Sequence, residues 1–252
     1  MKRILDGMIR TMNSVKPPRM TALRELHEAE TGGGPFSILI GTILSARTKD
    51  ENTAKVVRAL FARYGDAKAL AGAKVGDVER IIRPIGFYRV KSRRIIEVAK
   101  IIDSQYGGAV PEDIDRLVEM PGVGRKTANC VLVYAFDRPA IPVDVHVHRI
   151  SNRLGLVDTK TPEETEQALM GVVPRRYWLR INDTFVMYGQ NICKPVSPMC
   201  GVCQIRADCR FYSANAAAQQ QQPPPARQKS RNSSSRRRQR PAPSASARAH
   251  AS

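Results

Sequence analysis

Four cysteines near the C-terminal end of the chain restrict how that part can fold. Their spacing is C-x6-C-x2-C-x5-C, and the residues are Cys193, Cys200, Cys203 and Cys209. Turn-forming residues between them predict a tight loop that gathers the sulfurs: Pro195, Pro198 and Gly201. Four thiolates in one loop are typical of a zinc ion or an iron–sulfur cluster. Zinc sites usually have two short C-x2-C pairs, so the single pair in this loop favours a cubane cluster.

Two disulfide bonds are the alternative use of these cysteines. The first residues, Met1 to Asp6, contain no uninterrupted apolar stretch after their charges and so predict no secretory signal. The longest apolar run, 36–44, is too short to span a membrane. We therefore expect a reducing compartment, where cysteines bind metals more often than they pair. Cys130 stands apart in an apolar stretch and is expected to be a buried thiol.

The chain is strongly basic. It has 41 Lys and Arg against 23 Asp and Glu in 252 residues, a formal net charge of +18. Eight of the basic residues and no acid lie in 214–252, so residues 1–213 keep 33 basic and 23 acidic side chains. This excess predicts a polyanionic partner, either nucleic acid or an anionic membrane surface.

The segment 214–252 has a composition typical of disorder. It contains a run of four glutamines and a run of three prolines, and alanine is its only apolar residue type. Such a segment cannot bury enough apolar surface to offset the entropy lost on ordering. Its basic run at 236–240 is expected to attract phosphates without specificity, and a nuclear targeting signal is the alternative.

The rest of the chain predicts mostly helices. Apolar residues recur at helical spacing in 56–61, 95–102 and 131–136, and Pro35 precedes an apolar stretch typical of a buried helix. The segment 141–147 is ambiguous. Its apolar residues alternate as in a strand, but they also fit a helix that begins after Asp144, with Asp144 as its N-cap.

Residues 117–129, LVEMPGVGRKTAN, predict a hairpin between two helices. A short helix leads into the hairpin, and a second helix begins at about Arg125. The hairpin residues are Pro121, Gly122, Val123 and Gly124. Glycines let backbone N–H groups approach a phosphate, and the second helix presents its positive end. Such a hairpin binds the DNA backbone without reading sequence, although a plain connection between two helices has the same pattern.

Lys126 and Asp144 are the candidate catalytic residues. Lys126 lies in the first turn of the second helix, where the helix dipole disfavours a charged amine and makes the nucleophilic neutral form more available. A lysine that only contacts phosphate is the alternative. Asp144 lies between two valines, where a carboxylate is costly to bury unless it caps a helix or pairs with a charge. As an N-cap it would stand near any developing positive charge.

Taken together, these residues resemble the endonuclease III family of helix–hairpin–helix DNA glycosylases. The similarity rests on L-x-x-M-P-G-V-G-R-K-T-A-N at 117–129, V-D-V-H at 143–146 and the four-cysteine loop. Two further segments match, L-S-A-R-T-K-D at 44–50 and I-G-F-Y at 85–88. The resemblance covers roughly residues 20–212.

This resemblance implies an all-α, two-domain fold. A helical-bundle domain at 29–137 would end in the helix–hairpin–helix, and residues 1–28 with 138–213 would form an iron–sulfur cluster domain. The segment 214–252 would be a disordered basic tail. The cleft between the domains would take a damaged nucleotide flipped out of the duplex.

The resemblance also implies a reaction. In this family the residue matching Lys126 is the nucleophile, and the residue matching Asp144 assists it. The protein would be a bifunctional DNA glycosylase and AP lyase of base excision repair. It would release oxidised or damaged pyrimidines through a Schiff base and then cleave the strand 3′ to the abasic site.

Further implied contacts are to duplex DNA with damaged bases or abasic sites. The hairpin would bind the backbone together with Arg125 and Lys194. Arg47 stands where bacterial members have Gln, which fills the hole left by the flipped base, and Phe87 replaces a Leu that wedges into the stack. The four cysteines would hold a structural 4Fe–4S cluster. We expect a monomer without membrane contact, in the cytoplasm of a prokaryote or the nucleus of a eukaryote.

Two alternatives belong to other classes of function. A monofunctional relative would remove mismatched thymine, uracil or adenine without cutting the strand, but such relatives usually lack the lysine that Lys126 matches. A non-enzymatic DNA-binding module would use the hairpin and the cysteines only for binding and stability. The paired presence of Lys126 and Asp144 at family spacing argues against that module.

Overall fold

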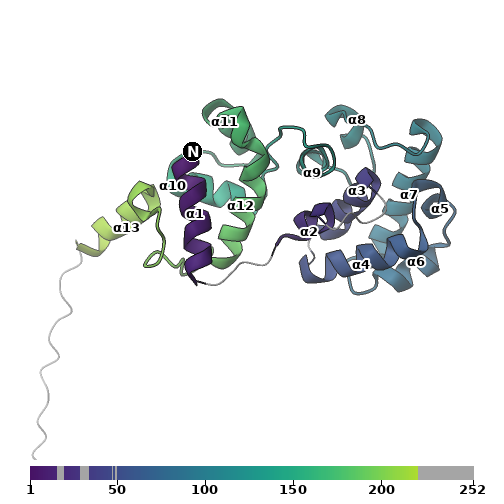
Figure 1. Cartoon of the computed structure of the whole chain (residues 1–252), viewed down its shortest axis with the longest axis horizontal. Helices are drawn as coiled ribbons and strands as arrows, with labels where there is room; N and C mark the ends of the chain where they lie inside the picture. The colour runs from purple at the N-terminus through teal and green to yellow at the C-terminus, as the bar shows by residue number, and fades with distance from the viewer. Residues whose placement is uncertain (16–19, 29–33, 47, 49, 221–252) are drawn as a thin grey trace, which may run out of the picture.

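The computed structural model describes residues 1–15, 20–28, 34–46, 48 and 50–220, and throughout these ranges the fold contains helices and no strand (Figure 1). The predicted all-α class is therefore confirmed. None of the helices in these ranges is long and apolar enough to cross a membrane.

The first group of helices surrounds one hydrophobic core. The group consists of α2 (Ala22–Glu28), α3 (Gly34–Ser45), α4 (Asp50–Arg63), α5 (Ala67–Ala71), α6 (Val75–Ile82), α7 (Tyr88–Tyr106), α8 (Ile114–Val118) and α9 (Arg125–Phe136). Helix α3 is buried on all sides from Phe36 to Leu44, as expected for a helix that is apolar all round. It packs against α2, α4, α7 and α9. We call this group the first cluster.

The remaining helices form a second, separate core. They are α1 (Lys2–Val15), α10 (Val145–Leu154), α11 (Pro162–Val172), α12 (Trp178–Asn191) and α13 (Arg210–Gln220), with short 3₁₀ turns at Arg175–Tyr177 and Arg206–Asp208. Leu5, Met8 and Met12 of α1 are buried among residues of α10 and α12. Figure 1 shows α1 beside α10 and α12, apart from α4–α8. We call this group the second cluster.

Two expected boundaries need correction. The family resemblance places α2 in the cluster domain with the rest of 1–28, but Leu23 and Leu26 are buried in the first cluster and α2 packs on α3 and α4. The tail expected to be disordered from 214 continues as helix to Gln220, because alanines at 214 and 216–218 favour a helix. Residues 221–252 lie outside the described residues. The rest of the predicted division stays a prediction.

The ambiguous segment 141–147 begins a helix. Helix α10 starts after Asp144, whose Oδ1 accepts hydrogen bonds from the backbone N–H groups of His146 (2.8 Å) and Val147 (2.9 Å). This N-cap satisfies donors that a helix start leaves without partners. The preceding apolar residues, Ile141 and Val143, are buried in the second cluster instead of pairing in a sheet.

Helices α10 and α12 approach closely at Gly189. A Cβ placed there would lie 2.4 Å from His146 Nδ1 and 2.9 Å from His146 Cβ. We therefore expect Gly189→Ala to push the start of α10 away and to lower the free energy of unfolding by about 1–3 kcal/mol.

Urea unfolding of Gly189→Ala and of a matched control checks this prediction. Gly171 lies in α11, and a Cβ placed there would meet no atom within 4 Å, so Gly171→Ala should raise stability by up to about 1 kcal/mol. Equal effects of the two substitutions would contradict the proposed close packing.

Candidate functional site

The predicted hairpin joins α8 to α9. Gly122 has a φ of +78°, a conformation that favours glycine, and Val123 N donates to Met120 O at 3.0 Å. Gly124 is the N-cap of α9 and supplies no side-chain cap. The first N–H groups of α9 therefore have no capping side chain, which is the arrangement that binds an anion.

Arg125, which is expected to bind the DNA backbone, forms an ion pair within the protein. Its Nε donates to Glu166 Oε1 at 2.9 Å, and the Glu166 side chain is only 6% exposed. This ion pair joins α9 to α11, so the guanidinium is engaged within the protein as well as partly exposed. Its predicted role in DNA binding stays a prediction.

Lys126 and Asp144 line the same cavity, which has a volume of about 500 Å³. Lys126 lies in the first turn of α9, which belongs to the first cluster, and Asp144 caps α10, which belongs to the second. Each cluster therefore supplies one of the two candidate catalytic residues. The N-cap hydrogen bonds of Asp144 use Oδ1 alone and leave Oδ2 out of the cap. The other lining residues are Thr21, Ala22, Leu23, Ser45, Ala46, Thr48, Tyr134, Val145, His146, Asn182, Val186 and Gln190.

Cys130 lies one turn after Lys126 on α9 and is fully buried. Burial raises the pKa of its thiol, while the charge of Lys126 and a hydrogen bond with Lys126 act in the opposite direction. Cys130 is therefore the buried thiol that the sequence predicts, and it also contacts Lys126. Helical spacing of four residues between the two positions predicts this neighbourhood.

Sequence reasoning missed Lys91. Its side chain is buried, and Nζ donates to Leu44 O (2.8 Å), Ala46 O (2.6 Å) and Thr48 Oγ1 (3.0 Å). Ala46 and Thr48 line the cavity, so Lys91 holds one wall of it. Lys91 precedes Ile95 by one helical turn, on the buried face of α7. A lysine at such a position in the sequence indicates a buried amine that needs hydrogen-bond partners.

Phe87 and Arg47 are the two residues expected to enter the duplex, and the structure describes only Phe87. Phe87 is 62% exposed and directly precedes α7, with a φ of +60° that is rare for a bulky side chain. An exposed aromatic side chain in strained backbone is typical of a functional position. Arg47 lies outside the described residues.

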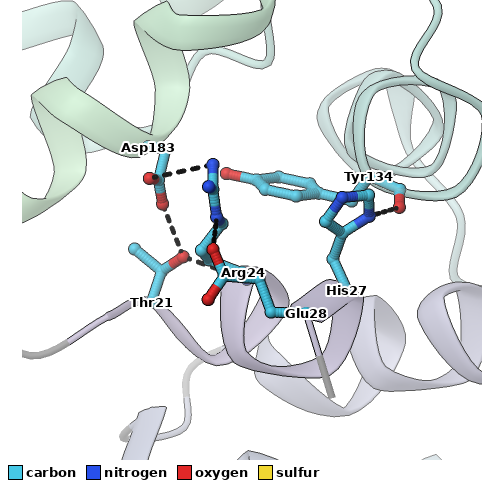
Figure 2. Close-up of polar contacts among 6 residues, drawn as sticks. All are labelled: Thr21, Arg24, His27, Glu28, Tyr134 and Asp183. Carbon is cyan, nitrogen blue, oxygen red and sulfur yellow. Dashed lines mark hydrogen bonds and ion pairs between the residues drawn. The ribbon is translucent and has the colours of Figure 1, made fainter. Parts of the chain in front are cut away.

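Helix α2 and Thr21, the residue before it, make polar contacts with α9 and α12 (Figure 2). Thr21 Oγ1 donates to Asp183 Oδ1 at 2.9 Å, and Arg24 Nη1 lies 3.9 Å from Asp183 Oδ2. Burial raises the pKa of Asp183, while Thr21 and Arg24 favour its charged form. His27 Nδ1 lies 2.7 Å from Tyr134 O on α9. These contacts connect α2 to both α9 and α12.

The four cysteines of the loop line one apolar cavity in the second cluster. All four are free thiols, so the disulfide alternative finds no support. Tyr188 Oη donates to Cys203 Sγ at 2.9 Å, and Arg153 Nη1 donates to Cys193 Sγ at 3.4 Å. Burial raises the pKa of Cys200 and of Cys209.

Neighbouring groups hold the four-cysteine loop in place. Arg153 also donates to the carbonyl oxygens of Lys194 (2.7 Å) and Pro195 (2.8 Å). The Lys194 side chain itself is exposed. Across the described part of the chain, no three His, Cys, Asp or Glu side chains are grouped closely enough to hold a single metal ion.

Comparisons with known proteins agree with this geometry. The family described as "HhH-GPD superfamily base excision DNA repair protein" matches residues 40–175. The fold and the cavity therefore define a protein of this superfamily. Endonuclease III of Thermotoga maritima is 50% identical over 178 residues, which cover 71% of this chain and 84% of that protein. The chain belongs to the endonuclease III family.

Solved structures give the same result. A trapped covalent intermediate of endonuclease III with DNA matches with a TM-score of 0.72 and 33% identity, covering 85% of this chain and 96% of that one. A thermostable thymine-DNA glycosylase matches with a TM-score of 0.71 and 24% identity, covering 84% and 96%. At that identity, the second match shows the fold alone.

Lys91 gives a prediction about pH. Burial lowers its pKa from 10.5 to about 8, so the folded protein binds fewer protons than the unfolded chain between these values. The contribution of Lys91 to stability should therefore rise with pH across this window, by up to about 1.4 kcal/mol per pH unit.

Urea unfolding of the wild type and of Lys91→Met at pH 7, 8, 9 and 10 measures this contribution, because the other titrations cancel in the difference. The stability of the wild type relative to Lys91→Met should increase above pH 8. A difference that is constant over this range would show that the ammonium is not desolvated.

Proposed function

We propose that Lys126 and Asp144 release damaged pyrimidines from duplex DNA and then cleave the strand at the resulting abasic site. Endonuclease III enzymes are DNA glycosylases with AP lyase activity, and this chain is a member of that family. The observation that carries the assignment of residues is the cavity shared by Lys126 and Asp144. It brings an amine and a carboxylate to one space from two different helices.

In the first step, the neutral amine of Lys126 attacks C1′ of the deoxyribose. A bond forms between Nζ and C1′, and the bond between C1′ and the base breaks with its electron pair leaving on the base. Asp144 accepts the lysine proton or stabilises the positive charge that develops on the sugar. The position of Lys126 in the first turn of α9 supports this role, since the helix dipole disfavours the ammonium there.

In the second step, opening of the sugar ring gives a Schiff base between Lys126 and C1′. Loss of a proton from C2′ then allows β-elimination, and the 3′ phosphate leaves with the electrons of its C–O bond. The strand is cut, and hydrolysis of the Schiff base restores the lysine. The lyase reaction therefore requires the same nucleophile as base release, which is why one residue supports both activities.

Duplex DNA is the proposed partner, bound by a monomer. The uncapped start of α9 at Gly124 and the +78° φ of Gly122 support contact with a backbone phosphate. The exposure of Phe87 supports its insertion into the base stack, and the exposed Lys194 can contact phosphate. Two of the matched structures are complexes of endonuclease III with DNA.

The cysteine cavity supports a 4Fe–4S cluster over the other metal options. Four free thiols surround one space, and their donors Tyr188 and Arg153 provide the hydrogen bonds that cluster ligands commonly receive. The single C-x2-C pair in the loop also favours a cluster over a single zinc ion. The residues that would hold the cluster are Cys193, Cys200, Cys203 and Cys209. When bound, it would link this loop to α10 and α12 as a structural element.

The mismatch glycosylase without lyase activity is the less supported alternative. Its structural match shows the fold alone, whereas relatives of 39–50% identity are named endonuclease III. A DNA-binding module without catalysis would leave the shared cavity of Lys126 and Asp144 without a use.

Trapping with borohydride tests the nucleophile. Incubation with a duplex that carries thymine glycol, followed by reduction, should give a covalent adduct with the wild type and none with Lys126→Ala. Asp144→Asn should slow adduct formation by about 10²-fold or more, as expected for the loss of a general base.

Lys100→Ala is the control for this experiment, because Lys100 is exposed on α7 and does not line the cavity. It should form adduct at the wild-type rate. An undiminished adduct with Lys126→Ala would refute the assignment of the nucleophile.

Absorption of anaerobically purified protein tests the cofactor. A 4Fe–4S protein should be yellow-brown, with a broad band near roughly 400 nm. Replacement of Cys203 by Ser should reduce this band and the iron content. A colourless protein with one equivalent of zinc would contradict the cluster.

A further inference from the structure

Two buried hydrogen bonds connect the helix of Lys126 with the segment that carries Asp144. Tyr134 Oη on α9 donates to Asn182 Oδ1 at 3.0 Å. Asn182 Nδ2 on α12 donates to Pro142 O at 2.9 Å. Pro142 lies two residues before Asp144, and Tyr134 lies eight residues after Lys126. We call these two hydrogen bonds the asparagine bridge.

The asparagine bridge is shielded from water. Tyr134 and Asn182 are each 4% exposed, and Pro142 is buried. A buried hydrogen bond is costly to leave unmade, because no water replaces the missing partner. The three groups are therefore held at hydrogen-bonding distance in a way that exposed side chains are not.

Because Lys126 and Tyr134 lie on the same rigid helix, α9, a constraint on Tyr134 also constrains Lys126. Eight residues of helix span about 12 Å, and a helix within a packed core does not stretch. The position of Tyr134 thus sets the position of Lys126. At the other end, only Val143 separates Pro142 from Asp144, the N-cap of α10, whose Oδ1 is fixed by two hydrogen bonds.

Helix α12 is itself fixed near the bridge. Asp183, the next residue after Asn182, accepts from Thr21 and faces Arg24 (Figure 2). Asn182 therefore does not move freely between α9 and Pro142. Its amide oxygen and its amide nitrogen are both used within the protein, so the side chain has a bridging role although it lines the cavity.

We propose that Tyr134 and Asn182 are positioning residues that fix Asp144 relative to Lys126. They do not touch the reacting atoms; they hold the two clusters at the separation that proton transfer and attack at C1′ require. The inference rests on the proposed function of Lys126 and Asp144. Misplacement of a reacting group by about 1 Å is enough to cost on the order of 10²-fold in rate.

Single-turnover kinetics on a thymine glycol duplex test the proposal. Asn182→Ala removes both hydrogen bonds and should slow base release and adduct trapping by about 10- to 100-fold. Tyr134→Phe removes a single hydroxyl with little change in packing and should slow both by a smaller factor. The Kd for the lesion duplex should stay within about twofold, because the hairpin that binds the backbone is unchanged. The double variant should be no slower than Asn182→Ala.

Asn152→Ala is the matched control. Asn152 also bridges two segments, donating to His148 O at 2.9 Å and accepting from Thr159 N at 2.9 Å, but it does not line the catalytic cavity. It should lower the melting temperature as much as the bridge variants do while leaving the rate of base release unchanged. This comparison separates positioning from a general loss of stability.

Each outcome has a distinct meaning. Bridge variants that react at the wild-type rate, or that lose affinity instead of rate, would overturn the positioning role while Lys126→Ala still abolishes the adduct. A full adduct with Lys126→Ala would overturn the proposed function itself, and this inference with it. If Asn182→Ala fails to fold, Tyr134→Phe decides the question, since a wild-type rate in that variant refutes the bridge.

Discussion

The packing of α9 on α3 is the contact on which the rest of the site depends. Helix α3 is buried along nearly its whole length, and α9 presents an apolar face to it, so neither helix can rotate without exposing a large apolar surface. The pairing brings the end of α3 to the start of α9. Ser45 and Ala46 therefore meet Lys126 at one cavity, and the reacting groups lie where two helix ends converge.

Polar contacts fix the walls of the cavity in addition to this apolar packing. Lys91 holds the loop after α3, Asp144 caps α10, and Thr21 bonds to Asp183 across the two clusters. Hydrogen bonds depend on direction and distance far more than apolar contacts do. The two clusters can thus supply bulk stability, while a few buried polar groups determine how accurately the catalytic side chains face each other.

Much of this arrangement could be predicted from local sequence. The hairpin glycines, the start of α9 and the four-cysteine loop are properties of short segments, and Asp144 could be named as a possible cap. The contacts of Lys91, Asn182 and Arg125 could not be predicted. Periodicity tells which face of a helix is buried, but the partner on the opposite element depends on how helices distant in sequence pack together. The place of α2 is a further example, because the family resemblance puts it with the cluster domain whereas Leu23 and Leu26 are buried in the first cluster.

The position of α1 at the start of the chain affects the order in which the two clusters can fold. Its apolar face, with Leu5, Met8 and Met12, is buried with residues of α10, of α12 and of the segment around Ile205, all of which follow the first cluster in the chain. During synthesis the first cluster can close from neighbouring segments, whereas the apolar side of α1 remains uncovered. Contacts between such distant segments form slowly, because a long loop must close first. We therefore expect the second cluster to assemble late in folding, and the catalytic cavity, which Asp144 lines from that cluster, to form with it.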